Sequence, residues 1–217
     1  MKVAVILAGC GYLDGAEIRE SVLALLELDK AGASVQCFAP DINQYHVINH
    51  LIGQEQEGQV RNVLQESARI ARGEVEDLVN LNEKEFDALV IPGGFGVAKN
   101  LSDLAFKGPD AQVLPEFKAV LDAFIQAKKP IGAICISPAV LVAALKDNLH
   151  PTVTIGDDED GLIPALGATH TVCKTSDIVI DDVHNIITCS AYMREDALKD
   201  IAQGIEKLVH QVIIRCN

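Results

Sequence analysis

The sequence is short of positive charge. Its 217 residues include 18 lysines and arginines against 31 aspartates and glutamates, which gives a formal net charge of −13. Nucleic acids and anionic membrane surfaces are bound mainly through clusters of lysine and arginine, and the chain has no such cluster. We therefore expect no nucleic-acid partner and no membrane partner, and phosphate-rich ligands are disfavoured on the same ground.

Long apolar runs and paired cysteines are also missing. No apolar stretch approaches the roughly 18 residues that a membrane-spanning helix requires. Residues 7–10, Leu-Ala-Gly-Cys, imitate a lipoprotein cleavage box, but the run before them is too short for a secretory signal and is typical of a first strand. No Cys-x-x-Cys pair occurs, and scattered thiols indicate a reducing compartment, so we expect a cytoplasmic protein. The six cysteines are Cys10, Cys37, Cys135, Cys173, Cys189 and Cys216.

Strand and helix patterns alternate along the chain. Residues 2–8 form an apolar strand, a helix is expected from Asp14 to Gly32, and residues 34–39 form a second strand. Such a β-α-β unit predicts a parallel sheet with right-handed crossovers. With no repeat, low-complexity tract or linker, we expect an α/β fold with one domain over residues 1–217. Further strands are expected at 86–91, 131–134, 152–155, 178–180 and 186–188, helices at 60–71, 113–127, 138–145 and 194–212, and a loop or short hairpin before residue 60.

Cys135 stands where a buried strand runs directly into a helix. Ser137 and Pro138 are residue types favoured at an N-cap and at the first helical position. The helix dipole and unpaired N–H groups at such a corner favour a thiolate, so we expect a lowered pKa for Cys135. Small residues two positions away on each side, Ala133 and Ser137, match the elbow that holds hydrolase nucleophiles. The alternative is that Cys135 is a small buried hydrophobe.

Two glycine-rich turns follow probable parallel strands. The turn at residues 93–96, Gly-Gly-Phe-Gly, can present backbone N–H groups, and with the N–H of Ile136 it would form an oxyanion hole in which Gly94 is a donor. The alternative is a tight turn that merely needs glycine. The turn at residues 9–15 is one residue longer than a dinucleotide fingerprint, and Asp14 places a carboxylate where a pyrophosphate would lie, so no nucleotide cofactor is expected.

Two glutamates open the first helix. Glu17 fits a reciprocal cap with Asp14. Glu20 has no such structural role and could lean toward Cys135, where it would stay protonated and exchange a proton with the sulfur.

The histidines give weaker signals. His46 and His50 have the spacing of a zinc pair, but Val47 replaces the glutamate of His-Glu-x-x-His and no third ligand is apparent, so no metal is expected. His150 and His170 lie in loops that could approach Cys135, and the sequence does not choose between a pair with Cys135 and exposure to solvent.

Taken together, these motifs resemble a known superfamily. Residues 90–96 (Val-Ile-Pro-Gly-Gly-Phe-Gly), 98–102 (Ala-Lys-Asn-Leu-Ser) and 133–139 (Ala-Ile-Cys-Ile-Ser-Pro-Ala), with Glu20, resemble the ThiJ/PfpI superfamily. Residues 9–20 and 190–193 (Ser-Ala-Tyr-Met) resemble its ElbB-type members, named for enhanced lycopene or isoprenoid biosynthesis and also described as glyoxalases.

The resemblance implies a flavodoxin-like three-layer sandwich of the class I glutamine amidotransferase type, with a mostly parallel sheet and helices on both faces. It implies that Cys135 is the nucleophile, Glu20 its protonated partner, and Gly94 and Ile136 the oxyanion donors. The implied activity is that of a lyase, a glyoxalase that converts glyoxal to glycolate without a cofactor. A homodimer is also implied.

The sequence departs from the wider superfamily beside the cysteine. Amidotransferase and protease relatives carry histidine where this chain has Ile136, and other relatives place one near Gly156 and Asp157. We therefore expect a slow glyoxalase acting on small dicarbonyls. The alternatives are a protective or regulatory protein that uses Cys135 as an oxidation sensor, a chaperone or deglycase-type protein, and an amidotransferase or peptidase.

Overall fold

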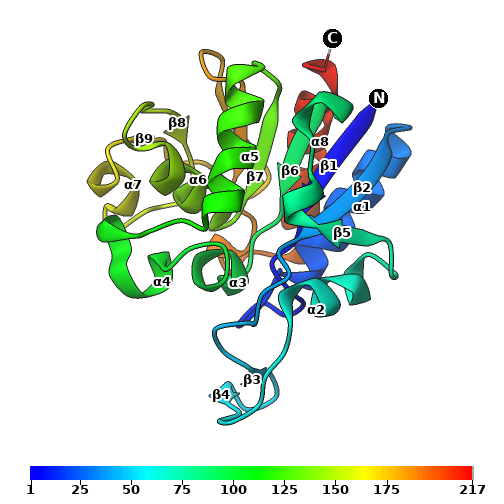
Figure 1. Ribbon diagram of the computed structural model, residues 1–217. Helices are drawn as coiled ribbons and strands as arrows, with labels where there is room; N and C mark the ends of the chain where they lie inside the picture. Colours follow the sequence, from blue (N-terminus) through cyan, green and yellow to red (C-terminus); the bar gives the residue numbers. More distant parts are fainter. Residues whose placement is uncertain (217) are drawn as a thin grey trace.

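The computed structural model describes residues 1–216 and is built around a seven-stranded sheet with the strand order β10-β11-β7-β6-β1-β2-β5 (Figure 1). All neighbouring strands are parallel except β10, which pairs with β11 in antiparallel fashion. The strands are β1 (Lys2–Ile6), β2 (Ser34–Ala39), β5 (Val75–Asp77), β6 (Ala88–Ile91), β7 (Ile131–Ile134), β10 (Val179–Asp181) and β11 (Ile186–Cys189).

Helices cover both faces of this sheet. Along β1, Val3 and Val5 pack with one set of helices, whereas Ala4 and Ile6 pack with the other, because successive side chains of a strand point to opposite faces. This architecture confirms the predicted α/β class with a mostly parallel sheet. The first layer holds α1 (Ile18–Lys30), α2 (Val63–Ile70) and α8 (Leu198–Ile214), and the second holds α3 (Phe95–Lys99), α5 (Pro115–Gln126) and α6 (Ser137–Leu145).

Shorter elements complete the chain. A hairpin of β3 (Ile48–Asn49) and β4 (Gln54–Glu55) protrudes from the main body (Figure 1). Of the loop and the short hairpin considered for this region, the structure has the hairpin. None of the helices within residues 1–216 combines the length and the apolar character needed to cross a membrane. The remaining elements are β8 (Thr152–Val153), β9 (Thr169–His170), α4 (Leu104–Lys107), α7 (Leu162–Ala165) and the 3-10 turns η1 (Leu78–Asn80), η2 (Glu83–Glu85), η3 (Gly108–Asp110) and η4 (Ala191–Met193).

The start of the first helix differs from the prediction. α1 begins at Ile18, and its N-cap is Glu17, whose side chain accepts a hydrogen bond from the N–H of Glu20. Asp14 is buried instead and accepts a hydrogen bond from the N–H of Ile48 at 2.7 Å. The predicted reciprocal cap between Asp14 and Glu17 is therefore wrong, because Asp14 anchors the protruding hairpin.

Two strands also differ from the prediction. The strand expected at 152–155 lies outside the main sheet as β8, which pairs with β9. The N–H groups of Thr152 and Thr154 donate hydrogen bonds to the side chains of Asp181 and Thr188 and not to a strand of the main sheet. The edge strand β5 was not expected, since two of its three residues are charged and none of them is buried.

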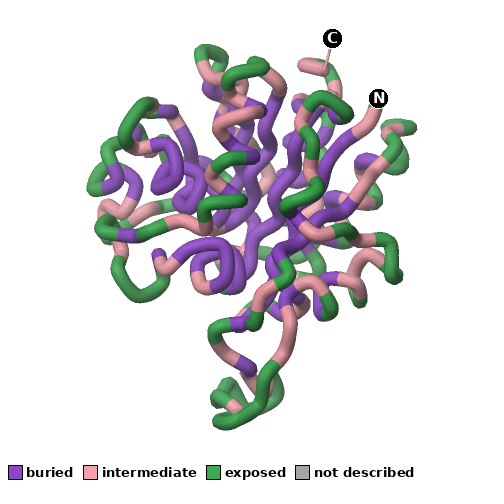
Figure 2. Tube along the Cα trace, in the orientation of Figure 1, coloured by how far each residue is buried: buried purple, intermediate pink, exposed green. Residues whose placement is uncertain are grey.

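The central strands β6, β7 and β11 consist of buried residues, and Figure 2 shows the centre of the molecule as buried. On α8, four fully buried side chains recur at helical spacing: Ile201, Ile205, Leu208 and Val212. Each contributes roughly 1.5–3 kcal/mol of burial free energy. The helix also approaches the loop before β10 closely at Gly204, where an added Cβ would lie 2.2 Å from the carbonyl oxygen of Thr175.

This contact predicts that Gly204→Ala destabilises the protein. In an open helix, alanine would be favoured over glycine by about 1 kcal/mol. Here the methyl group would meet backbone, so we expect the free energy of unfolding to fall by about 1–3 kcal/mol. Urea unfolding measures this free energy. The control is Gln203→Ala, a substitution at an exposed position of the same helix. A Gly204→Ala protein at least as stable as the wild type would contradict the contact.

Candidate active site

Cys135 lies at the carboxyl end of β7 in a strained backbone conformation. Its φ is +65°, a value that non-glycine residues rarely adopt, and its N–H donates to the carbonyl oxygen of Cys189 at 2.9 Å. Such strain is typical of the turn that holds a nucleophile between strand and helix. The residue is 6% exposed.

The helix after this corner starts differently from the prediction. α6 begins at Ser137, and its N-cap is Ile136. The hydroxyl of Ser137 donates to the carbonyl oxygen of Pro92 at 2.7 Å rather than accepting from the helix, so the predicted serine N-cap is wrong. This bond ties the corner to the loop after β6.

Glu20 reaches the same point from the first turn of α1. Its side chain is fully buried and hydrogen-bonds to the side chain of Cys135. Oε2 accepts from the N–H of Gly93 at 2.9 Å, and Oε1 accepts from the N–H of Tyr192 at 3.2 Å. Three segments distant in sequence therefore hold one carboxyl group against the sulfur.

Glycine is required at position 93 for this contact. A Cβ on Gly93 would lie 2.4 Å from the Cβ of Cys135 and 2.7 Å from Oε2 of Glu20. Neither neighbour can retreat without breaking the pair. The glycine after β6 is thus explained by close approach rather than by turn geometry alone.

Burial raises the pKa of Glu20 to about 8, because a dry site disfavours the carboxylate, and the nearby charge of Glu17 acts in the same direction. The hydrogen bonds from Tyr192, Cys135 and Gly93 oppose this shift but do not overcome it. Glu20 is accordingly mostly protonated at neutral pH.

Burial also raises the pKa of Cys135 well above that of an ordinary thiol, and the charge of Glu20 adds to this effect. The N–H groups of Gly94 and Ile136 hydrogen-bond to the sulfur and lower the pKa, but by less. The predicted lowering is therefore wrong: desolvation outweighs the helix N-terminus, and the resting group is a thiol.

The four residues selected from the sequence meet at one place. Cys135, Glu20 and the N–H groups of Gly94 and Ile136 surround the sulfur. A reacting carbonyl oxygen near the sulfur would find these two N–H donors close by, which is the arrangement an oxyanion requires. Sequence reasoning assigned no role to Tyr192, whose bond to Glu20 uses the backbone N–H and so does not depend on residue type.

The histidines do not join this group. Nδ1 of His150 lies 2.7 Å from the carbonyl oxygen of Gly167, and Nε2 of His170 accepts from the N–H of Ile155 at 3.3 Å. Within residues 1–216, no hydrogen bond links a histidine to Cys135.

The two histidines of the possible zinc pair lie near different carboxylates. His46 lies 3.8 Å from a carboxylate oxygen of Glu55, whereas His50 lies 3.6 Å from one of Asp14. In the described part of the chain, no three side chains of metal-ligating type gather around one point.

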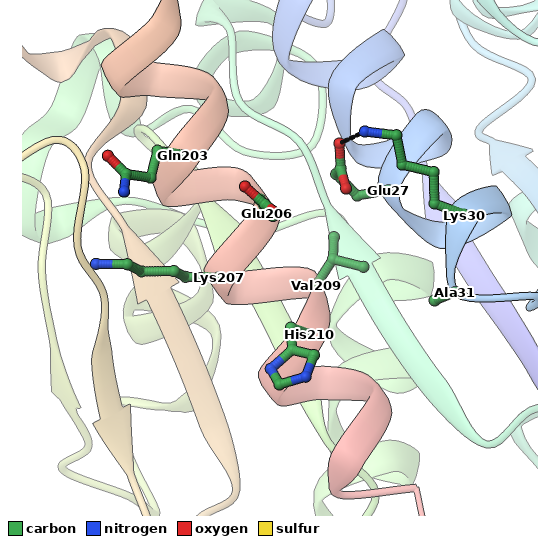
Figure 3. A pocket seen from close by; sticks show the side chains of 8 residues that line it. All are labelled: Glu27, Lys30, Ala31, Gln203, Glu206, Lys207, Val209 and His210. Atoms are coloured by element: carbon green, nitrogen blue, oxygen red, sulfur yellow. Dashed lines mark hydrogen bonds and ion pairs between the residues drawn. The ribbon is translucent and has the colours of Figure 1, made fainter.

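A cleft of about 530 Å³ borders the site at the start of α1. Glu17 and Tyr192 line it, and each hydrogen-bonds to Glu20. A second groove, of about 590 Å³, lies between α1 and α8 (Figure 3). Its lining includes Glu27 and Lys30 at the other end of α1 from Glu20, so we do not assign it to the site.

Comparison with known proteins gives relatives along the whole chain. A human protein named glutamine amidotransferase-like class 1 domain-containing protein 3, mitochondrial, is 46% identical over 98% of this chain and 82% of its own length. The rat ES1 protein homolog, mitochondrial, is 43% identical over 98% of this chain and 83% of its own. Because both names place these relatives in mitochondria, the cytoplasmic location stays a prediction.

A solved structure shares the fold closely. It is an isoprenoid biosynthesis protein with an amidotransferase-like domain from Ehrlichia chaffeensis, 51% identical over the full length of both chains, with a TM-score of 0.96. A sequence model of the DJ-1/PfpI family also matches residues 1–152, which contain Glu20, Gly94 and Cys135. The chain therefore belongs to the DJ-1/PfpI family.

Proposed function

We propose that this protein is a cofactor-independent glyoxalase that converts glyoxal and similar small dicarbonyls to 2-hydroxy acids. The observation that carries the proposal is the hydrogen bond between Cys135 and a buried Glu20 whose pKa is raised to about 8. A group that titrates near the working pH can both accept and return a proton within one turnover.

The first step joins the sulfur to one aldehyde carbon. The ionised form of Glu20, about a tenth of the molecules at pH 7, accepts the thiol proton as the sulfur of Cys135 attacks. The carbonyl oxygen becomes an oxyanion that the N–H groups of Gly94 and Ile136 stabilise. Glu20 then returns the proton to this oxygen, which gives a hemithioacetal and restores the carboxylate.

The second step moves a proton between the two carbons. Glu20 removes the proton from the sulfur-bearing carbon, which gives an enediolate with its negative charge on the second carbonyl oxygen. This oxygen takes the proton of the neighbouring hydroxyl group, and Glu20 returns its own proton to the second carbon. The product is a thioester of glycolate on Cys135. Water attacks the thioester, which releases glycolate and a proton and regenerates the thiol.

The site is less suited to amides. A thiol with a raised pKa and no histidine partner is a weak nucleophile, and amides are far less electrophilic than aldehydes. We therefore propose a slow enzyme and disfavour amidotransferase and peptidase activity. The low exposure of Cys135 limits direct attack to a small carbonyl group.

An oxidation sensor has less support than an enzyme. Oxidation of cysteine to the sulfinic acid proceeds from an exposed thiolate, whereas Cys135 is buried and its pKa is raised. The ElbB-type assignment, the link to isoprenoid biosynthesis and the homodimer remain proposals. For the first two, the support is the likeness to the E. chaffeensis protein.

The proposal predicts that Cys135→Ala abolishes glycolate formation from glyoxal, with a fall in kcat of more than about a thousandfold because the covalent route is lost. Glycolate is measured by chromatography, and thermal unfolding checks that the variant folds. Cys216→Ala, which removes a partly exposed thiol, should keep the wild-type rate. Turnover in Cys135→Ala equal to that of the wild type would rule the proposal out.

A second prediction concerns pH. The kcat/KM for glyoxal should rise with pH and level off above an apparent pKa of about 8, because Glu20 must be ionised to accept the thiol proton. Glu20→Gln should lower kcat/KM by about a hundredfold or more and remove this rise. A wild-type profile that is flat between pH 6 and 9 would contradict the assigned role of Glu20.

A further inference from the structure

Arg19 presents a cation next to the site. The residue precedes Glu20 in the chain and is exposed, and its Nη1 donates to the hydroxyl of Tyr192 at 3.0 Å. The guanidinium carbon also lies 5.9 Å from the centre of the Tyr192 ring. Within residues 1–216 no carboxylate forms an ion pair with Arg19, although the charge of Glu17 attracts its guanidinium.

Most of the other arginines differ in this respect. Arg194 binds Asp157 at 2.5 Å and Arg215 binds Asp182 at 2.5 Å. Arg69 lies 2.9 Å from Glu66, and Arg61 lies 3.7 Å from the same carboxylate. Arg72 is exposed and has no ion pair among the described residues, but it does not line the cleft beside the site.

Arg19 lines the cleft of about 530 Å³, and Glu20 lies beside this cleft, behind Tyr192. Ile18, Tyr12 and Tyr192 give its walls apolar surface. Two arginines, Arg19 and Arg194, also line it, and Arg194 is bound to Asp157. Tyr192 contacts both Arg19 and Glu20: its hydroxyl accepts a hydrogen bond from the guanidinium, and its backbone N–H donates one to the carboxyl group. The volume far exceeds that of a two-carbon dicarbonyl.

Charge decides which kind of larger ligand fits. The acids at the cleft are Glu17, whose carboxylate accepts from the N–H of Glu20, and Glu195 at the surface. With a net charge of −13 the protein repels anions in general. An anionic ligand in this cleft would therefore depend on a specific cation, and Arg19 offers the planar donors that a carboxylate prefers.

We propose that Arg19 and Tyr192 form a subsite for the carboxylate of a longer substrate, a 2-oxoaldehyde that carries a carboxylate a few carbons from its dicarbonyl end. This proposal rests on the proposed glyoxalase function. The aldehyde would react at Cys135, the aliphatic chain would lie against Ile18 and the tyrosines, and Arg19 would bind the carboxylate. The chemistry is that of glyoxal: a proton moves between carbons and one water is added.

The kinetic test compares glyoxal with 4,5-dioxopentanoate, which the same reaction converts to 2-hydroxyglutarate. In Arg19→Gln, the kcat/KM for 4,5-dioxopentanoate should fall about tenfold relative to that for glyoxal, mainly through KM. Arg72→Gln removes the same charge away from the cleft and should leave the ratio of the two unchanged. Arg19→Lys should restore part of the lost preference. A ratio in Arg19→Gln equal to the wild-type ratio would overturn the subsite.

A binding test separates the subsite from the chemistry. In the Cys135→Ala background, calorimetry should show that 2-hydroxyglutarate binds and that its affinity falls with added salt. The further substitution Arg19→Gln should lower this affinity about tenfold. Thermal unfolding should be unchanged, because Arg19 is exposed. If glyoxal turnover survives in Cys135→Ala but 2-hydroxyglutarate binding depends on Arg19, the proposed glyoxalase mechanism is wrong and the proposed subsite is supported. Equal binding with and without Arg19, or no binding to either protein, would overturn the subsite.

Discussion

The structure depends on a carboxyl group kept dry against a thiol. Glu20 is fully buried, and among residues 1–216 its oxygens accept hydrogen bonds from the N–H groups of Gly93 and Tyr192 and from Cys135. A buried carboxylate without a cation is costly, so the group retains its proton until about pH 8. Folding therefore favours the protonated acid: this stability is fully present below the ordinary pKa and is lost as the pH rises toward 8.

Close approach of three loops makes this contact possible. The loops after β1, β6 and β7 meet at the carboxyl edge of the sheet, where open α/β sheets place their ligands. Gly96 lies against the loop after β1, since an added Cβ would be 2.4 Å from the Cα of Gly15. The glycines of residues 9–15, which imitate a dinucleotide fingerprint, thus serve backbone packing beside the site.

Sequence patterns predicted the main sheet apart from β5 and the longer helices, and they selected four candidate site residues that lie together in the structure. Strand and helix periods mark the layers, and small residues around Cys135 mark the elbow. Three features had no such signal. Asp14 binds the hairpin through a distant N–H, the bond from Tyr192 to Glu20 uses backbone alone, and the pKa of Cys135 depends on burial that only the folded chain creates. Helix position alone predicted the wrong direction for that pKa.

The two raised pKa values fit one chemical task better than several. Near neutral pH the pair of Glu20 and Cys135 holds two protons, and loss of one gives a shared-proton state in which acid and nucleophile are interchangeable. Such a pair spends little time as a free thiolate, which disfavours both oxidation and attack on unactivated amides. An aldehyde needs only brief activation of the sulfur and then repeated proton transfers over short distances. A buried carboxyl group that titrates near pH 8 can make these transfers. The burial that weakens Cys135 as a nucleophile therefore also raises the pKa of Glu20 into the range where it can carry the proton.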